Sequence, residues 1–152
     1  MKRLPCLLGL SLLALCSCVS PPPPAPLASA DADGAAKQFA PPEGMADVYV
    51  VHEGSTFGPK TPIAVMMDGK SLGYLGVGTY FLAVVAPGRH KILLPGGGDF
   101  AWIQVDAAAG KNYYYNVSLG GEPGAKPTLA IVVLESMGKL MVRQYPRAQA
   151  SQ

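Results

Sequence analysis

The stretch FAWIQVDAAAGKNYYYNVSL (residues 100–119) contains two runs in which apolar and polar side chains alternate, residues 100–105 and 112–119. A period of two places successive side chains on opposite faces of a β-strand. Ala109-Gly110-Lys111, between the runs, is typical of a turn. We therefore predict two strands here, with Tyr114 on the face opposite to that of its neighbours Tyr113 and Tyr115.

Comparable short segments lie on both sides of this stretch, at residues 47–52, 63–68, 71–75, 79–85, 89–94 and 128–135. Asp68-Gly69 joins two of them and predicts a tight hairpin, because these residues adopt the positive φ angles that such turns need. Residues 79–85 are almost wholly apolar, which predicts a central strand buried on both faces. Seven or eight short strands in about 100 residues predict an all-β fold, an antiparallel β-sandwich.

The boundaries of this domain follow from where the strand pattern starts and stops. We place the β-sandwich at residues 45–145. Near its end, residues 137–143 fit either a short C-terminal helix or an edge strand that packs Leu140 and Met141 onto the body. We expect residues 146–152 to form a frayed tail, as chain ends often do.

The N-terminus has the composition of an export signal. Lys2 and Arg3 precede a run of apolar or small residues from 4 to 15, which is shorter than the about 20 apolar residues that a transmembrane helix needs. Leu15-Cys16-Ser17-Cys18 then resembles the lipobox of bacterial lipoproteins. This resemblance implies a signal peptide at residues 1–17 and a lipidated Cys18; an ordinary secretory signal is the alternative.

A lipidated Cys18 would make a membrane the partner of this chain and place it in the cell envelope. Val19 stands where an aspartate favours retention in the inner membrane of enterobacteria, so the outer membrane, facing the periplasm, is favoured in a Gram-negative host. Residues 18–44 are rich in proline and alanine, and we expect a disordered tether that spans about 30 Å.

Charge and cysteine content exclude several classes of function. All three cysteines lie in the first 18 residues, so the body has no disulfide and no thiolate nucleophile. Without Lys2 and Arg3, ten basic residues balance ten acidic ones. A neutral domain does not indicate binding to nucleic acid.

No motif indicates catalysis, a cofactor or a metal. The two histidines, His52 and His90, lie far apart in sequence, and Asp47, Glu53 or Asp99 would complete a metal site only if the fold brought them together. No serine lies in the Gly-x-Ser-x-Gly setting of a hydrolase. We therefore expect a protein that is not an enzyme.

Aromatic residues are the most suggestive candidates for a binding site. Trp102 and Tyr114 are the candidates for a platform that stacks on sugar rings or on a peptide. The alternative is that these aromatic residues form cross-strand pairs that stabilise a sheet.

Residues 46–142 also carry a family resemblance. The blocks that match are Val48-Tyr49-Val50, Met67-Asp68-Gly69-Lys70, Gly78-Thr79-Tyr80-Phe81, Ala86-Pro87-Gly88-Arg89-His90, Ala109-Gly110-Lys111-Asn112-Tyr113-Tyr114 and Pro127-Thr128-Leu129. In order and spacing they resemble the bacterial lipoprotein family catalogued as domain of unknown function 2846. The resemblance implies a transthyretin- or PEGA-like β-sandwich on a lipid anchor, without an agreed activity.

The function that these features favour is a non-catalytic structural or interaction module, anchored in the envelope and contacting another envelope protein. The alternative is a module that binds glycan or peptidoglycan through its surface aromatics. An enzyme would need a pocket that the sequence does not reveal.

Overall fold

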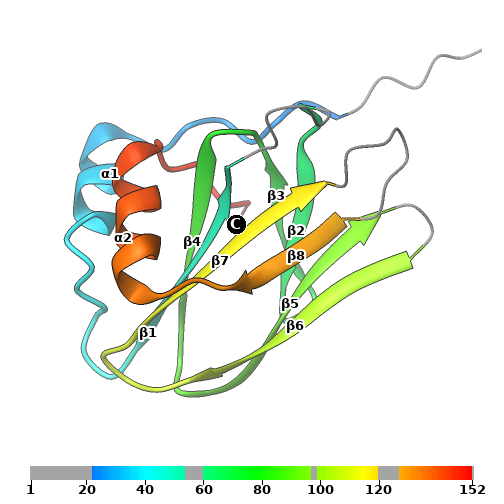
Figure 1. The fold of residues 1–152 in the computed structure, drawn as a ribbon. Coiled ribbons are helices and arrows are strands. Elements are labelled where there is room, and N and C mark those ends of the chain that lie inside the picture. Colours follow the sequence, from blue (N-terminus) through cyan, green and yellow to red (C-terminus); the bar gives the residue numbers. More distant parts are fainter. Residues whose placement is uncertain (1–21, 54–59, 97–98, 120–126, 152) are drawn as a thin grey trace, which may run out of the picture.

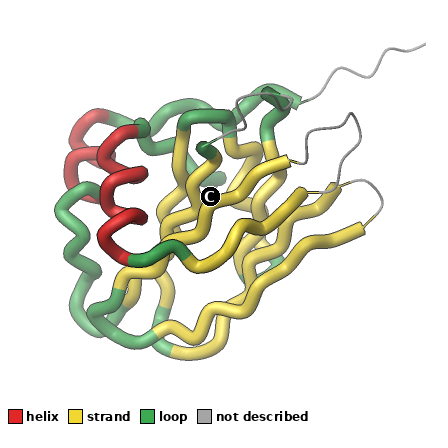
Figure 2. The backbone as a smooth tube through the Cα atoms, viewed as in Figure 1, coloured by secondary structure: helices red, strands yellow, loops and turns green. Residues whose placement is uncertain are grey.

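The computed structural model describes residues 22–53, 60–96, 99–119 and 127–151, in which eight strands and two helices are formed. The strands make two four-stranded sheets that pack face to face (Figures 1 and 2). The first sheet has the order β4 (Thr79–Val85), β1 (Ala46–His52), β7 (Asn112–Leu119), β8 (Pro127–Val132). The second has the order β3 (Lys70–Leu75), β2 (Ile63–Met67), β5 (Gly88–Gly96), β6 (Asp99–Ala107). The predicted all-β sandwich is confirmed.

Most neighbouring strands run antiparallel, but β1 and β7 are parallel. Asp68 and Gly69 form the predicted hairpin turn between β2 and β3, with φ angles of 51° and 80°. Alternation along the strands fills the space between the sheets with apolar side chains, among them Val50, Val65, Ile92, Val105 and Val117. This is the main core of the molecule.

The prediction of a central strand at residues 79–85 is wrong about its position. The strand has those bounds, but β4 lies at the edge of its sheet, and the central strand with every residue buried is β1. β4 is apolar on both faces for another reason. Its inner face meets the main core through Phe81, and its outer face meets a layer of helices through Tyr80 and Leu82.

The helical layer consists of α1 (Ala30–Ala36) and α2 (Glu135–Gln144), which lie side by side over the outer face of the first sheet (Figure 1). A second core forms between the helices and the sheet, and its aromatic members are Phe39, Tyr49, Tyr80 and Tyr114. Residues 137–143 are therefore helical. Met141 is buried as expected, whereas the expectation for Leu140 is wrong, because it lies on the solvent-facing side of α2.

The predictions of a disordered tether at residues 18–44 and of a frayed tail at residues 146–152 are both wrong for the residues that the structure describes. The C-terminal segment pairs in parallel with β4 at Tyr80 and Arg147, and Leu27 pairs with Ala148 on its other side. On the opposite side, the N–H of Ala25 donates to the carbonyl of Tyr74 on β3 (2.7 Å). The two terminal segments thus join the β4 edge of one sheet to the β3 edge of the other.

Unpaired backbone groups at these two edges explain why the termini are ordered. An exposed edge strand presents N–H and C=O groups that another extended segment can satisfy. The composition of residues 22–44 predicts little apolar burial, but it does not reveal that their main-chain groups have hydrogen-bond partners at the sheet edges. Ala25 and Ala148 also pack against the main core.

α1 begins at Ser29, whose hydroxyl accepts a hydrogen bond from the N–H of Ala32 (3.2 Å). Asp33 then connects the helix to its surroundings. It accepts hydrogen bonds from the hydroxyl of Tyr80 (2.7 Å) and the N–H of Arg147 (3.0 Å), and it pairs with Lys37 (2.7 Å). Neither of the helices described is long and apolar enough to cross a bilayer.

Candidate binding surface on the second sheet

The two sheets differ in what lies on their outer faces. Both described helices cover the first sheet, and neither lies on the outer face of the second (Figure 1). Across this second face, Met66 is paired with Leu93, and Leu93 with Trp102. Ile92 and Leu94 point into the core, so Leu93 points outward. The result is an apolar row, Met66–Leu93–Trp102, which crosses three neighbouring strands at one level.

Trp102 is 58% exposed, the most solvent-accessible member of this row. The ammonium of Lys91, on the neighbouring strand, lies 4.5 Å from the centre of its ring. Lys91 is opposite Gln104, so it reaches Trp102 diagonally across the strand pair. This contact holds a positive charge against the indole without burying it.

A shallow hollow of about 410 Å³ adjoins the indole. Its lining is polar apart from the tryptophan: Asp68, Arg89, His90, Lys91, Trp102 and Gln104. An exposed aromatic ring beside side chains that donate and accept hydrogen bonds can bind a flat or ring-shaped polar ligand. We refer to the row and the hollow together as the uncovered face.

Asp68 and His90 form a hydrogen-bonded polar pair in the hollow. Nδ1 of His90 lies 2.6 Å from a carboxylate oxygen of Asp68, and Nε2 lies 2.7 Å from the carbonyl of Ala86. Both ring nitrogens therefore face acceptors, which favours the doubly protonated imidazolium. The hydrogen bond with Asp68 raises the pKa of His90, and the carbonyl of Ala86 adds to the effect.

Asp68 is fixed by its place in the hairpin turn. Its second carboxylate oxygen accepts the N–H of Lys91 (2.8 Å), and its own N–H donates to the carbonyl of Lys91 (2.9 Å). Partial burial acts to raise the pKa of Asp68, but the hydrogen bonds from His90 and Lys91 outweigh it, and the pKa is lowered. The Asp-Gly turn thus holds this hydrogen-bonded pair beside Trp102 in the hollow.

Tyr114 does not join Trp102 in a platform, so that expectation is wrong. The two residues lie in different sheets, and Tyr114 is 2% exposed beneath α2. Its ring stacks on Tyr49, with centres 5.1 Å apart. The alternative drawn from the sequence, a cross-strand aromatic pair, holds here, because Tyr49 and Tyr114 are directly opposite each other on β1 and β7.

The two histidines are not brought together. His52 is buried in the first sheet, where its Nδ1 lies 3.2 Å from the carbonyl of Leu75, and burial lowers its pKa. Asp47 is buried on the same strand, and Glu53 accepts a hydrogen bond from Asn116. Within the described residues, no three His, Cys, Asp or Glu side chains cluster as metal ligands would.

The predicted lipidation site, Cys18, lies outside the described residues, and so does the side chain of Asp99. Met66 and Leu93 belong to the candidate surface but were missed by the sequence reasoning. Their outward positions follow from alternation in their strands, whereas the pairing of β2 with β5 joins segments that are not neighbours in the chain.

No protein-family model matches this chain, and no curated protein matches it either.

Proposed function

We propose that this protein is an envelope lipoprotein, held to a membrane through lipid on Cys18, whose β-sandwich is a non-catalytic interaction module. The uncovered face is its contact surface for another envelope protein. The outer membrane of a Gram-negative cell, on the periplasmic side, is the proposed location. The resemblance to the family of domain of unknown function 2846 supports this location and remains a prediction.

The anchor part of the proposal rests on Leu15-Cys16-Ser17-Cys18 and the short apolar run before it. One acyl chain binds a membrane only marginally, and two or three make a durable anchor. Mass spectrometry of the exported protein tests this directly. The expected mass begins at residue 18 and carries acyl chains; an unmodified cysteine, or cleavage elsewhere, would contradict the anchor.

The observation that carries the interaction part is the in-register row of Met66, Leu93 and Trp102 on a sheet face that no described helix covers. A row of large apolar side chains across a solvent-facing sheet is typical of a contact surface. Tryptophan is also one of the residues enriched at the energetic centres of protein interfaces.

Site-specific photocrosslinking in intact cells tests this surface. A photoreactive phenylalanine at position 102 is expected to capture one reproducible partner. The same residue at Ser136, exposed on α2, is the matched control. Equal capture from both positions, or no reproducible product from position 102, would argue against the uncovered face as the contact surface.

A second candidate function is the binding of glycan or peptidoglycan, and the exposed indole beside a polar hollow is the observation that favours it. Sugar rings stack on exposed aromatic faces while polar neighbours bond their hydroxyls. The chain has a single tryptophan, so its fluorescence reports on this site alone. Titration with cell-wall fragments should shift the emission; an unchanged spectrum would exclude this candidate.

A further inference from the structure

The ordered N-terminal segment changes how close the sandwich can be to its anchor. Pro22, the first described residue, follows Cys18 by four positions. A fully extended chain covers at most about 3.6 Å per residue, so these four positions span at most about 14 Å. A disordered tether up to residue 44 would instead let the domain move freely over a much larger distance.

Residues 25–28 are fixed to the body from both sides. The N–H of Ala25 donates to the carbonyl of Tyr74, and the N–H of Ala28 donates to the carbonyl of Arg147 (2.9 Å). The N–H of Gln149 donates in return to the carbonyl of Pro26 (2.8 Å). Because this segment pairs with both neighbours, it has one position on the sandwich, and the anchor must lie beside that position.

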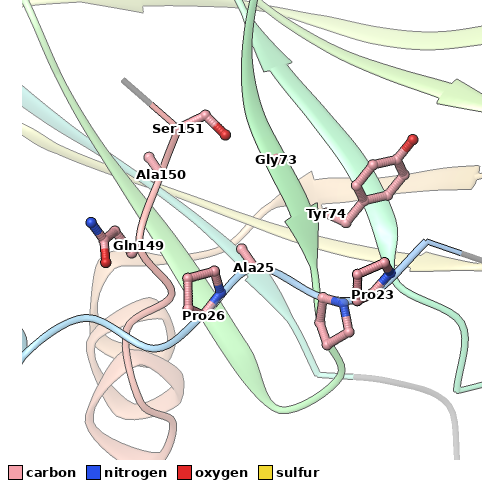
Figure 3. Close-up of a pocket in the computed structure, with 9 residues that line it drawn as sticks. Pro23, Ala25, Pro26, Gly73, Tyr74, Gln149, Ala150 and Ser151 are labelled. Carbon is pink, nitrogen blue, oxygen red and sulfur yellow. The ribbon is translucent and has the colours of Figure 1, made fainter.

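The surface around this segment is mostly apolar. Proline rings line two shallow hollows, one of which also includes Gly73 and Tyr74 (Figure 3). Leu27 is 56% exposed and Tyr74 is 41% exposed. Among the described residues that line the two hollows, Lys60 is the only charged one. We call Pro22, Pro23, Pro24, Leu27 and Tyr74 the anchor edge.

We propose that the anchor edge lies against the headgroup region of the phospholipid bilayer. Tyrosine suits the boundary between water and lipid, because its ring is apolar and its hydroxyl is polar. Leucine and proline rings add apolar area, and a lysine beside them can reach lipid phosphates. The inference rests on the proposed lipidation of Cys18, which brings the edge within reach of the membrane.

This placement gives the sandwich a defined orientation. The described chain begins at the top of Figure 1, next to β3, whereas α2 begins at the lower left. Leu134, the N-cap residue of α2, lines neither of the two hollows, and it is 80% exposed. It provides a control position of similar chemistry that should not meet lipid.

Quenching by brominated lipid measures the orientation. Two proteins carry one tryptophan each on a Trp102→Phe background, Tyr74→Trp in one and Leu134→Trp in the other. Each lipidated protein is bound to phosphatidylcholine vesicles, with and without bromine on the acyl chains. We expect loss of emission at position 74 and none at position 134. Leu27→Trp repeats the test should Tyr74→Trp fail to fold.

The outcomes separate the two proposals. A protein that carries acyl chains and floats with vesicles, yet shows no quenching at positions 74 and 27, overturns the orientation and leaves the lipoprotein proposal intact. Quenching at position 134 equal to that at position 74 also overturns it. A protein without acyl chains that does not float contradicts the anchor itself, as the mass measurement would show independently.

Discussion

Tyr114 packs its ring directly against the backbone of α2 at Gly138. A Cβ atom at position 138 would come within 2.6 Å of Cδ1 of Tyr114, closer than carbon atoms approach in folded proteins. The absence of a side chain at this one position lets the helix lie on the ring. The contact explains why a tyrosine that the sequence offers as a surface aromatic is part of the second core instead.

Gly138→Ala should therefore destabilise the protein, although alanine normally stabilises a helix relative to glycine. Overpacking of a filled core typically costs about 1–3 kcal/mol. Chemical denaturation measures the change in the free energy of unfolding. Gly34→Ala is the matched control: it lies inside α1 with open space around it, and we expect a gain of about 0.5–1 kcal/mol. A gain at both positions would refute the packing of α2 on Tyr114.

Asp33 should be the residue on which the attachment of the two termini depends most. Asp33→Ala leaves the buried hydroxyl of Tyr80 and the N–H of Arg147 without their acceptor, which costs about 1–3 kcal/mol. Asp31→Ala removes the same charge from the same helical turn but is exposed, so it controls for the helix dipole. Thermal unfolding of both variants should show a clear loss for Asp33 alone.

The pH dependence of this loss has a definite sign. Burial acts to raise the pKa of Asp33, but the hydrogen bonds with Lys37, Tyr80 and Arg147 outweigh it, and the pKa is lowered. The stabilisation is therefore present above the usual value of about 3.9 and is lost as pH falls through the lowered pKa. The stability difference between Asp33→Ala and Asp31→Ala should therefore shrink at pH values below the lowered pKa. A difference that stays the same there would contradict this account.

The local sequence pattern predicted the strands well, but it predicted poorly which segments distant in the chain pair with one another. The bounds predicted for residues 79–85 and 112–119 match the structure, and Asp68-Gly69 turns as expected. The parallel pairing of β1 with β7 and the docking of both termini depend on partners remote in sequence, which no local period encodes. The exposure of Trp102 and the burial of Tyr114 have the same origin, because α2 covers one sheet only.

The two histidines should titrate on opposite sides of the usual pKa of about 6.5. Hydrogen bonding raises the pKa of His90, and burial lowers that of His52. His90 thus stabilises the fold below about pH 6.5 and ceases to do so as pH rises through its raised pKa, whereas protonation of His52 destabilises the fold as pH falls. NMR titration of the two imidazoles measures both values.

The substitution Asp68→Asn tests whether the carboxylate of Asp68 raises the pKa of His90. It removes the carboxylate beside His90 and should lower the pKa of that histidine while leaving that of His52 unchanged. Movement of both values together would indicate a general loss of structure. No movement of either would show that the Asp68–His90 pair does not persist in solution.

Asp47 is a buried carboxylate whose hydrogen bonding is incomplete among the described residues. It is 3% exposed, one carboxylate oxygen lies 3.3 Å from the hydroxyl of Tyr49, and the other has no hydrogen-bond partner among the described residues. Its register neighbour on β7, Asn112, also has an amide oxygen without a donor. Two buried acceptors at paired positions therefore lack a donor.

Burial raises the pKa of Asp47, although the hydrogen bond from Tyr49 and the charge of Arg147 act in the opposite direction. A raised pKa means that the charged form costs stability above about pH 3.9 and that the cost disappears at lower pH. Asp47→Asn, which replaces an acceptor with a donor, should therefore stabilise the protein at pH 7 by about 1 kcal/mol. The gain should vanish near pH 3.

Denaturation curves of both proteins at pH 7 and pH 3 measure this difference, with Asp106→Asn, exposed on β6, as the control. Since the remaining titrating groups are common to wild type and variant, their contributions cancel in the comparison. A gain in stability that is the same at both pH values would mean that burial does not disfavour the charged carboxylate of Asp47. A loss of stability at pH 7 would mean that a favourable interaction compensates the charge of Asp47. It would also mean that more water reaches the space between β1, β7 and the helices than the burial of these side chains implies.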